Sequence, residues 1–177
     1  MRIISGVHKG RRLIAPKSLP VRPTTDLAKE SLFNILNNKI IFEDISVLDL
    51  FAGTGNISFE FASRGVQSIT SVDAHYGCVQ FIEKIATQLD MPISVIKADA
   101  YKFLEKTPQS FDIVFADPPY DFPIEKFIEI IDKIMSRSIL NENGMIIIEH
   151  SKYMDLSSQT NFRDARRYGA SVFSFFE

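Results

Sequence analysis

The stretch FDIVFADPPY, residues 111–120, decides how the rest of the sequence is interpreted. Its continuous apolar run, residues 113–116, predicts a buried β-strand. The two prolines that follow end the strand, because each fixes φ and lacks a backbone N–H donor. The carboxylate of Asp117, free carbonyls and the ring of Tyr120 remain at the strand end. Such a set can accept hydrogen bonds from an amino group while a flat base stacks nearby; the alternative is a strand stop followed by a packed aromatic residue.

Strand and helix patterns alternate from residue 46 to residue 149, which is typical of a parallel α/β sheet. We expect strands at Val47–Phe51, Ile69–Asp73, Ile93–Ala98, Phe111–Asp117 and Gly144–Glu149, and helices at Asn56–Arg64, Tyr76–Leu89, Tyr101–Glu105 and Ile124–Met135. Two further segments, Arg163–Tyr168 and Ala170–Phe176, predict an antiparallel hairpin around Gly169. A parallel sheet that ends in such a hairpin differs from the two-half dinucleotide-binding fold.

The first predicted strand opens into a glycine-rich turn, FAGTGN at residues 51–56, where the backbone could approach a ligand closely. The usual third glycine is replaced by Ser58, so this is only a partial dinucleotide fingerprint. Asp49 lies inside the first strand, and Asp73 and Asp99 end the second and third. Ligands of open α/β sheets bind at the C-terminal edge of the strands. We therefore expect these acids to line one pocket with the turn.

This predicted pocket offers carboxylates and no obvious cation for a pyrophosphate, which disfavours NAD. A cationic nucleoside fits better, and S-adenosylmethionine combines a sulfonium, an ammonium, a ribose and an adenine. Asp49 could reach the ammonium, Asp73 could hold two ribose hydroxyls, and Asp99 could accept from the adenine amino group. Taken singly, Asp73 and Asp99 could equally be turn residues that end their strands.

The composition describes one ordinary globular domain: 177 residues, 45% hydrophobic and 24% charged. No apolar run reaches the roughly 18–20 residues of a membrane span, and no signal-peptide core is visible. Cys78 is the only cysteine, which fits a reducing cytoplasm, and the three histidines lack ligand spacing. We expect a cytoplasmic protein without a membrane segment or a metal site.

Residues 1–25 form a basic arm that carries six Lys or Arg residues and no acid, so residues 26–177 must sum to −8. Such an asymmetry favours contact of the arm with a polyanion, although a solvated hairpin would look the same. We expect short strands at Arg2–Ser5 and Arg11–Ala15, a proline-rich linker, and a helix from Thr24, Thr25 or Asp26 to about Asn38. The candidate RNA-binding residues are Arg2, His8, Lys9, Arg11, Arg12 and Arg22. Residues 26–177 would form the main domain.

The chain resembles the RsmD family of bacterial 16S rRNA guanine-N2 methyltransferases nearly end to end. The matching segments are RIISGVHKGRRL, RPTTDLAKESLFNIL, VLDLFAGTG, FADPPY and IIIEHS. DPPY alone is shared with DNA and RNA amino-methyltransferases and, as NPPY, with protein-glutamine methyltransferases. The two N-terminal segments are what narrow the match.

The resemblance implies a Rossmann-like class I methyltransferase fold: a seven-stranded, mostly parallel sheet with an antiparallel C-terminal hairpin, preceded by the basic hairpin and a helix. It implies S-adenosylmethionine at Asp49, Phe51, Gly53, Gly55, Asp73, Ala74, Asp99 and Ala100, and a target amine at Asp117, Pro118, Pro119 and Tyr120. The implied partner is 16S rRNA within an assembled or assembling 30S subunit, and the expected state is a monomer. The tail after the fifth strand is loosely patterned, and no contacts are carried over to it.

Four other readings remain open at this point. A DNA adenine or cytosine methyltransferase shares the DPPY motif, and a protein-glutamine methyltransferase would prefer Asn at position 117. An NAD-dependent oxidoreductase would use the glycine turn but gives no reason for DPPY. A non-catalytic RNA-binding module would need the arm but not the acid-lined pocket.

Overall fold

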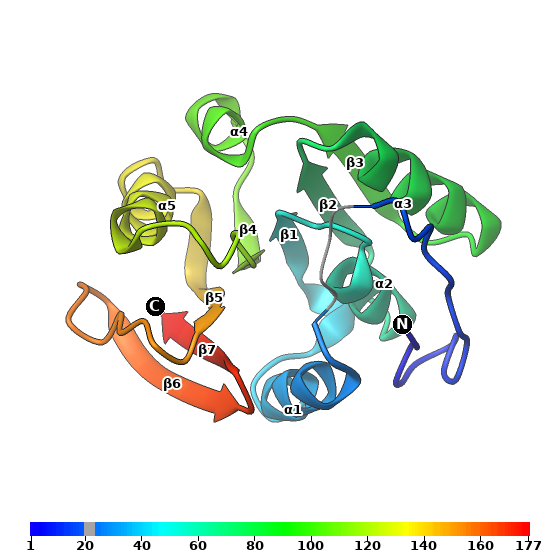
Figure 1. Cartoon of the computed structure of the whole chain (residues 1–177), viewed down its shortest axis with the longest axis horizontal. Helices are drawn as coiled ribbons and strands as arrows, with labels where there is room; N and C mark the ends of the chain where they lie inside the picture. Colours follow the sequence, from blue (N-terminus) through cyan, green and yellow to red (C-terminus); the bar gives the residue numbers. More distant parts are fainter. Residues whose placement is uncertain (20–23) are drawn as a thin grey trace.

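The computed structural model describes residues 1–19 and 24–177, so the predicted RNA contact Arg22 lies outside the described residues. One seven-stranded sheet forms the centre of the molecule, in the order β3-β2-β1-β4-β5-β7-β6 (Figure 1). The strands are β1 (Ser46–Leu50), β2 (Ser68–Asp73), β3 (Ile93–Lys97), β4 (Phe111–Ala116), β5 (Leu140–Ser151), β6 (Phe162–Tyr168) and β7 (Ser171–Phe176). β1 to β5 run parallel, and β7 is antiparallel to both of its neighbours. The predicted architecture is confirmed.

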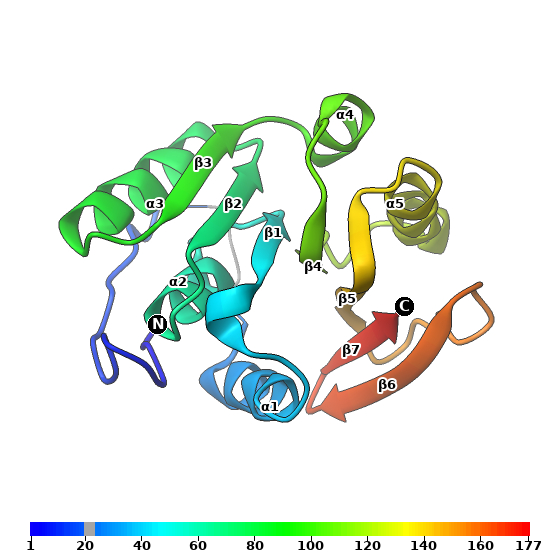
Figure 2. The same ribbon diagram turned by 180° about the vertical axis from the view of Figure 1, so that it is seen from behind.

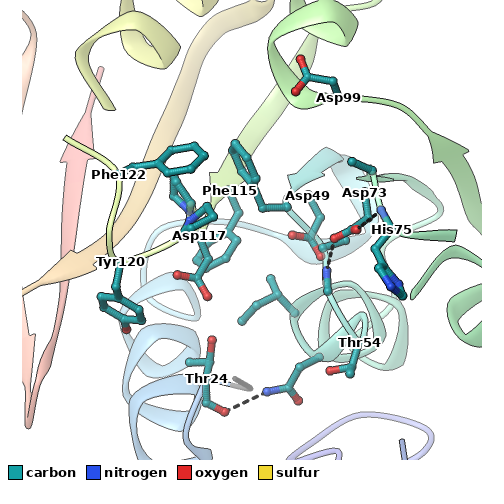
Figure 3. A pocket seen from close by; sticks show the side chains of 18 residues that line it. Thr24, Asp49, Thr54, Asp73, His75, Asp99, Phe115, Asp117, Tyr120 and Phe122 are labelled. Atoms are coloured by element: carbon teal, nitrogen blue, oxygen red, sulfur yellow. Dashed lines mark hydrogen bonds between the residues drawn. The ribbon is translucent and has the colours of Figure 1, made fainter. Parts of the chain in front are cut away.

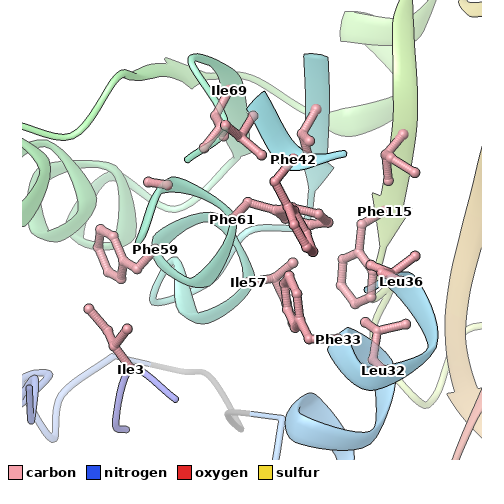
Figure 4. Packing of buried hydrophobic residues seen from close by; sticks show 14 of the residues in the cluster. Ile3, Leu32, Phe33, Leu36, Phe42, Ile57, Phe59, Phe61, Ile69 and Phe115 are labelled. Atoms are coloured by element: carbon pink, nitrogen blue, oxygen red, sulfur yellow. The ribbon is translucent and has the colours of Figure 1, made fainter. Parts of the chain in front are cut away.

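Helices cover both faces of this sheet (Figures 1 and 2). They are α1 (Asp26–Leu36), α2 (Asn56–Ser63), α3 (Tyr76–Gln88), α4 (Ala100–Lys106) and α5 (Ile124–Ser136), with a 3-10 turn η1 (Phe42–Asp44) before β1. Side chains of α1, α2 and α3 join one buried cluster, in which Phe33 and Phe61 stack edge to face at 4.7 Å (Figure 4). Side chains of α4 and α5 form the cluster on the other face. None of the helices in the described part of the chain has the length and apolar character needed to cross a bilayer.

The predicted boundaries differ most at β5, which begins at Leu140 instead of Gly144. Leu140 pairs with Phe111, and the register then shifts before Ile113 pairs with Met145. Asn143 adopts a left-handed φ of 62° within this irregularity. The polar stretch that resembles a loop in the sequence is therefore a β-bulge inside a longer strand.

The N-terminal arm does not form the two strands predicted for it. A single bridge joins Arg2 to Arg12. The backbone N–H groups of Ile4 and Ser5 instead donate to the Glu60 carboxylate, at 2.8 and 3.0 Å. Ile3 exchanges backbone hydrogen bonds with Arg11 and Gly10, and the bend at Ser5 and Gly6 then ends the ladder after one bridge.

The arm is packed onto α2 and shares the core of the main domain. Ile3 and Leu13 are buried in the same cluster as the α1 and α2 side chains, and Figure 4 shows Ile3 facing Phe59. Gly6 has a φ of +81°, and a Cβ there would lie 1.7 Å from the Ser63 carbonyl oxygen. Only glycine permits so close an approach.

A buried ion pair between α1 and α2 also stabilises the packing of the N-terminal arm. The Lys29 ammonium lies 3.4 Å from Glu60 and donates to the Arg2 carbonyl at 2.6 Å and to Asn56 Oδ1 at 2.8 Å. Arg64 adds a second cation at 2.9 Å from Glu60. Burial lowers the pKa of Lys29, and the Glu60 charge opposes that effect. The arm, α1 and α2 are thereby joined through one carboxylate.

Candidate active site

A cavity of about 480 Å³ opens at the C-terminal edge of β1, β2 and β4 (Figure 3). Ten of the predicted site residues line it: Asp49, Phe51, Gly53, Asp73, Ala74, Asp99, Asp117, Pro118, Pro119 and Tyr120. Gly55 and Ala100 lie next to the cavity in sequence but are not part of its lining as described. The predicted RNA contacts in the described part of the arm lie outside this cavity.

The turn after β1 reaches the cavity through left-handed backbone. Phe51, Gly53 and Gly55 have φ values of 59°, 55° and 74°. A Cβ on Gly55 would lie 2.9 Å from Ile82 and 3.0 Å from Phe59, so this glycine allows α2 to pack closely against α3. A non-glycine residue in the left-handed region costs of order 1–3 kcal/mol, and at Phe51 that strain places the ring at the cavity.

Asp73 holds the glycine turn in position. One carboxylate oxygen accepts from the Gly53 N–H at 2.8 Å, and the other accepts from the His75 N–H at 2.8 Å. A carboxylate has about four acceptor positions, so two remain available for a ligand. The residue therefore orders the turn and still offers its free lone pairs to the cavity.

Asp49 is buried at the floor of the cavity, where its Oδ2 accepts from the Ser58 N–H at 3.2 Å and from the Ser58 hydroxyl at 2.5 Å. Burial raises the pKa of Asp49 to about 7, against the opposing effect of the Ser58 hydrogen bonds. Ser58 is the residue that replaces the third glycine of the fingerprint. Its hydroxyl gives this turn a polar support for the acid.

Asp99 lies at the opposite rim, where it is exposed to solvent. Its Oδ1 accepts from the Lys102 N–H at 3.0 Å and so caps α4. The sequence left open a turn role and a ligand role for this acid. The structure shows the cap and also places the carboxylate at the cavity, so the two roles are compatible.

Asp117 directly follows β4 and faces the cavity from the side opposite Asp49 and Asp73 (Figure 3). Burial raises the pKa of Asp117 well above its usual range, and the charges of Glu149 and Asp49 raise it further. An acid in this state accepts a proton or a cationic neighbour readily.

Tyr120 is held at the cavity mouth by its hydroxyl, which lies 3.2 Å from Glu149 Oε1 and 3.1 Å from Ser171 Oγ. Burial raises the pKa of Tyr120 to about 12, so it is a neutral phenol at physiological pH. The Thr24 hydroxyl donates to the other Glu149 oxygen at 2.9 Å. One carboxylate thus fixes two residues of the cavity wall.

Glu149 and Thr24 were missed at the sequence level. Glu149 is 1% exposed, and burial raises its pKa. A signal was present in the sequence. Glu149 follows the apolar run III at residues 146–148, and so it continues the series of acids near the carboxyl ends of neighbouring strands. Thr24 carried no signal, because its position depends on how the chain enters α1.

Apolar side chains form the wall between the two acid groups. Phe51 packs edge to face against Phe122 and Tyr101, each with ring centroids 6.3 Å apart. Phe115 and Ile57 also line the cavity. Flat apolar walls with carboxylates at both ends suit a ligand with a planar ring and donor groups.

Comparison with known proteins shows the family to which this chain belongs. The family described as Conserved hypothetical protein 95 matches residues 1–177. Ribosomal RNA small subunit methyltransferase D of Haemophilus influenzae is 31% identical over 181 residues, covering 99% of this chain and 91% of the relative. The chain belongs to the RsmD family.

Two further proteins, both with methyltransferase in their names, are also similar to this chain. The Bacillus subtilis protein YlbH is 35% identical over an alignment of 162 positions, which covers 88% of this chain and 85% of that protein. The solved structure of the Escherichia coli protein yhhF has a TM-score of 0.86 at 26% identity and covers 99% of this chain and 96% of its own. The fold is that of the Rossmann-like methyltransferases, and membership of the RsmD family identifies the chain as a methyltransferase.

Proposed function

We propose that this protein transfers a methyl group from S-adenosylmethionine to the exocyclic N2 amine of a guanine in 16S rRNA of the small ribosomal subunit. One observation carries the proposal: a single cavity has the acids of the glycine turn at one side and Asp117 with Tyr120 at the other. The first group suits a cationic nucleoside and the second suits an amine on a flat base. The naming of the Haemophilus relative supports ribosomal RNA as the substrate.

The chemistry of the lining fits the cofactor. A volume of about 480 Å³ is within the usual range for a small-ligand pocket. Among the described residues, those that line the cavity include no Lys or Arg that could hold a pyrophosphate. Asp73 would accept from the ribose hydroxyls, Asp99 from the adenine amino group, and Asp49 would lie near the ammonium. The same lining offers no side-chain cation to the phosphates of NAD.

The protein's main contribution is to position the amine. S-adenosylmethionine supplies an electrophilic methyl group on a sulfonium. The guanine N2 lone pair is delocalised into the ring and is a poor nucleophile. Asp117 and the Pro118 carbonyl would accept the two amine hydrogens and direct the lone pair away from the ring plane. The Asp117 carboxylate would then take the proton that the methylated nitrogen loses.

Tyr120 would hold the base during this step. A target base inside a helix must leave the stack before it can enter a cavity. Stacking on an aromatic ring is worth about 1–3 kcal/mol per base. Because Glu149 and Ser171 fix the Tyr120 hydroxyl, its ring is ordered before the base arrives.

Cofactor affinity is expected to depend on pH through Asp49. The carboxylate form holds the ligand ammonium, and the pKa of Asp49 in the free protein is about 7. Affinity for S-adenosylhomocysteine should therefore weaken about tenfold as the pH falls from about 8 to about 6. Titration calorimetry across this range measures the change. The Asp49→Asn variant should bind weakly without the pH dependence, and a flat wild-type profile would remove Asp49 from the ammonium site.

The basic arm would grip the RNA backbone. Lys9, Arg11 and Arg12 are exposed, and such side chains give affinity and register without reading sequence. Replacing Arg11 and Arg12 with Ala should weaken binding of 16S rRNA and reduce the slope of log affinity against log salt by roughly 1.5. Arg137→Ala, an exposed cation after α5, serves as the control. If the double variant kept the wild-type salt slope, the arm would be a solvated surface that does not contact the RNA phosphates.

Titration calorimetry with S-adenosylhomocysteine and, separately, with NAD tests the cofactor assignment. Binding of S-adenosylhomocysteine alone is expected. Binding of NAD alone would overturn the reaction class. If neither bound, the titration would be repeated with 30S particles present.

A methylation assay tests whether the substrate must be assembled. Equal methylation of naked 16S rRNA and of 30S particles would count against a need for the assembled subunit.

A further inference from the structure

The loop after β5 and the end of β6 form an exposed surface of aromatic and basic side chains. We call Lys152, Tyr153 and Arg167 the hairpin surface. Tyr153 is 87% exposed, and the Lys152 ammonium lies 4.9 Å from the centre of its ring. An aromatic ring so exposed adds little to folding, because its apolar area stays in water. Its position needs another explanation.

The hairpin surface lies at the same edge of the sheet as the candidate active site. Ser151, the last residue of β5, pairs with Ser171, the first residue of β7. The Lys152 N–H donates to the Ala170 carbonyl at 3.0 Å, so the loop is attached to the β6–β7 turn. The Tyr120 hydroxyl lies 3.1 Å from the Ser171 hydroxyl. The hairpin surface is therefore linked to Tyr120, the proposed base-stacking residue, through the paired residues Ser151 and Ser171.

The cations of the hairpin surface are available for a partner. Within the described ranges, neither Lys152 nor Arg167 takes part in an ion pair with an acid. The Arg167 Nε donates to the Gly169 carbonyl at 3.1 Å, which holds the side chain near the turn. Arg163, at the other end of the hairpin, is instead 3.5 Å from Glu177.

The N-terminal arm and the hairpin surface lie on opposite sides of α1. Figures 1 and 2 show the arm beside α2 and the turn between β6 and β7 beside α1. Thr24, two residues before the start of α1, lines the cavity between them. An RNA strand whose target base enters the cavity could therefore contact the N-terminal arm on one side and the hairpin surface on the other.

We propose that the hairpin surface binds single-stranded RNA next to the target nucleotide: Tyr153 stacks on a neighbouring base, and Lys152 and Arg167 contact the phosphates. Aromatic rings interleaved with cations are the usual means of holding unpaired nucleic acid. The inference rests on the proposed function, because it takes RNA as the substrate. It gives the C-terminal hairpin a role in substrate binding in addition to its role in the sheet.

The test compares two variants that alter only exposed side chains. In the first, Lys152, Tyr153 and Arg167 are replaced together by Ala; in the second, Arg163→Ala alters a cation at the far end of the hairpin. Binding of unmodified 16S rRNA transcript and KM for 30S particles reconstituted from it are measured with wild-type protein alongside. S-adenosylhomocysteine calorimetry reports on the cavity.

The triple variant is expected to bind the RNA at least about tenfold more weakly. Its salt slope should fall by about 1.4, the value for two phosphate contacts on a single strand. S-adenosylhomocysteine binding and the Arg163→Ala variant should match the wild type. Equal RNA affinity and KM in the triple variant and the wild type would overturn the hairpin surface alone. A wild-type protein that binds S-adenosylhomocysteine but neither binds nor methylates the RNA would overturn the proposed function itself.

Discussion

Replacing Asp117 with Ala is expected to lower the rate of methyl transfer by at least about 10²–10³-fold while leaving S-adenosylhomocysteine affinity nearly unchanged. The carboxylate faces the cavity from the end of β4, away from Asp73 and the glycine turn. It would accept hydrogens of the amine and then its proton, so its loss affects the reacting nitrogen and spares the cofactor. Single-turnover kinetics with saturating RNA separate this loss from any change in substrate affinity.

Two further variants sharpen the Asp117 test. Asp117→Asn keeps a carbonyl acceptor but no proton acceptor, so it should retain more activity than Asp117→Ala. Asp121→Ala removes an exposed acid four residues further along and should behave like the wild type. If Asp117→Ala instead abolished S-adenosylhomocysteine binding, the residue would belong to the cofactor half of the cavity.

Replacing Glu60 with Ala should reduce the free energy of unfolding by about 3–5 kcal/mol, because Lys29 would be left as a buried charge without its partner. The Glu60 side chain is fully buried and contacts Lys29 at 3.4 Å and Arg64 at 2.9 Å. The amides of Ile4 and Ser5 would also lose their acceptor. Urea unfolding measures the stability, and amide hydrogen exchange of Ile4 and Ser5 reports on the arm.

The matched control is Glu83→Ala, which removes an exposed glutamate from α3 and should change stability by less than about 0.5 kcal/mol. The network also reaches the cavity, because Asn56 accepts from Lys29 and donates to the Thr24 carbonyl at 3.0 Å. A loss below about 1 kcal/mol, with unchanged exchange of Ile4 and Ser5, would show that the arm is held by apolar packing and not by this carboxylate.

The central sheet could be predicted because its signals are local. Runs such as Ile113–Ala116 are buried on both faces, and each is separated from the next by a helical pattern. The acids at the strand ends could be predicted for a related reason: parallel strands bring their carboxyl ends to one edge. The position of Asp49, Asp73 and Asp117 around one cavity follows from that geometry.

The attachments of the arm could not be predicted, because they join polar residues far apart in sequence. Lys29 and Glu60 look like ordinary helix-surface charges, and only the fold brings them together in the interior. In the sequence, Ser58 is interpreted only as the absence of a third glycine, whereas in the structure its hydroxyl donates a hydrogen bond to Asp49. The short strands expected in the arm do not form, because the chain bends at Ser5 and Gly6 and the Ile4 and Ser5 amides donate to Glu60.

Nucleoside analysis of the product is the most direct test of methyl transfer to guanine N2. Unmodified 16S rRNA, alone and reconstituted into 30S particles, is incubated with the protein and isotope-labelled S-adenosylmethionine, then digested and analysed by mass spectrometry. The label is expected in N2-methylguanosine, and the Asp117→Ala variant should give none above background. Label in a methylated adenosine or cytidine, or in a ribosomal protein, would contradict methyl transfer to guanine N2.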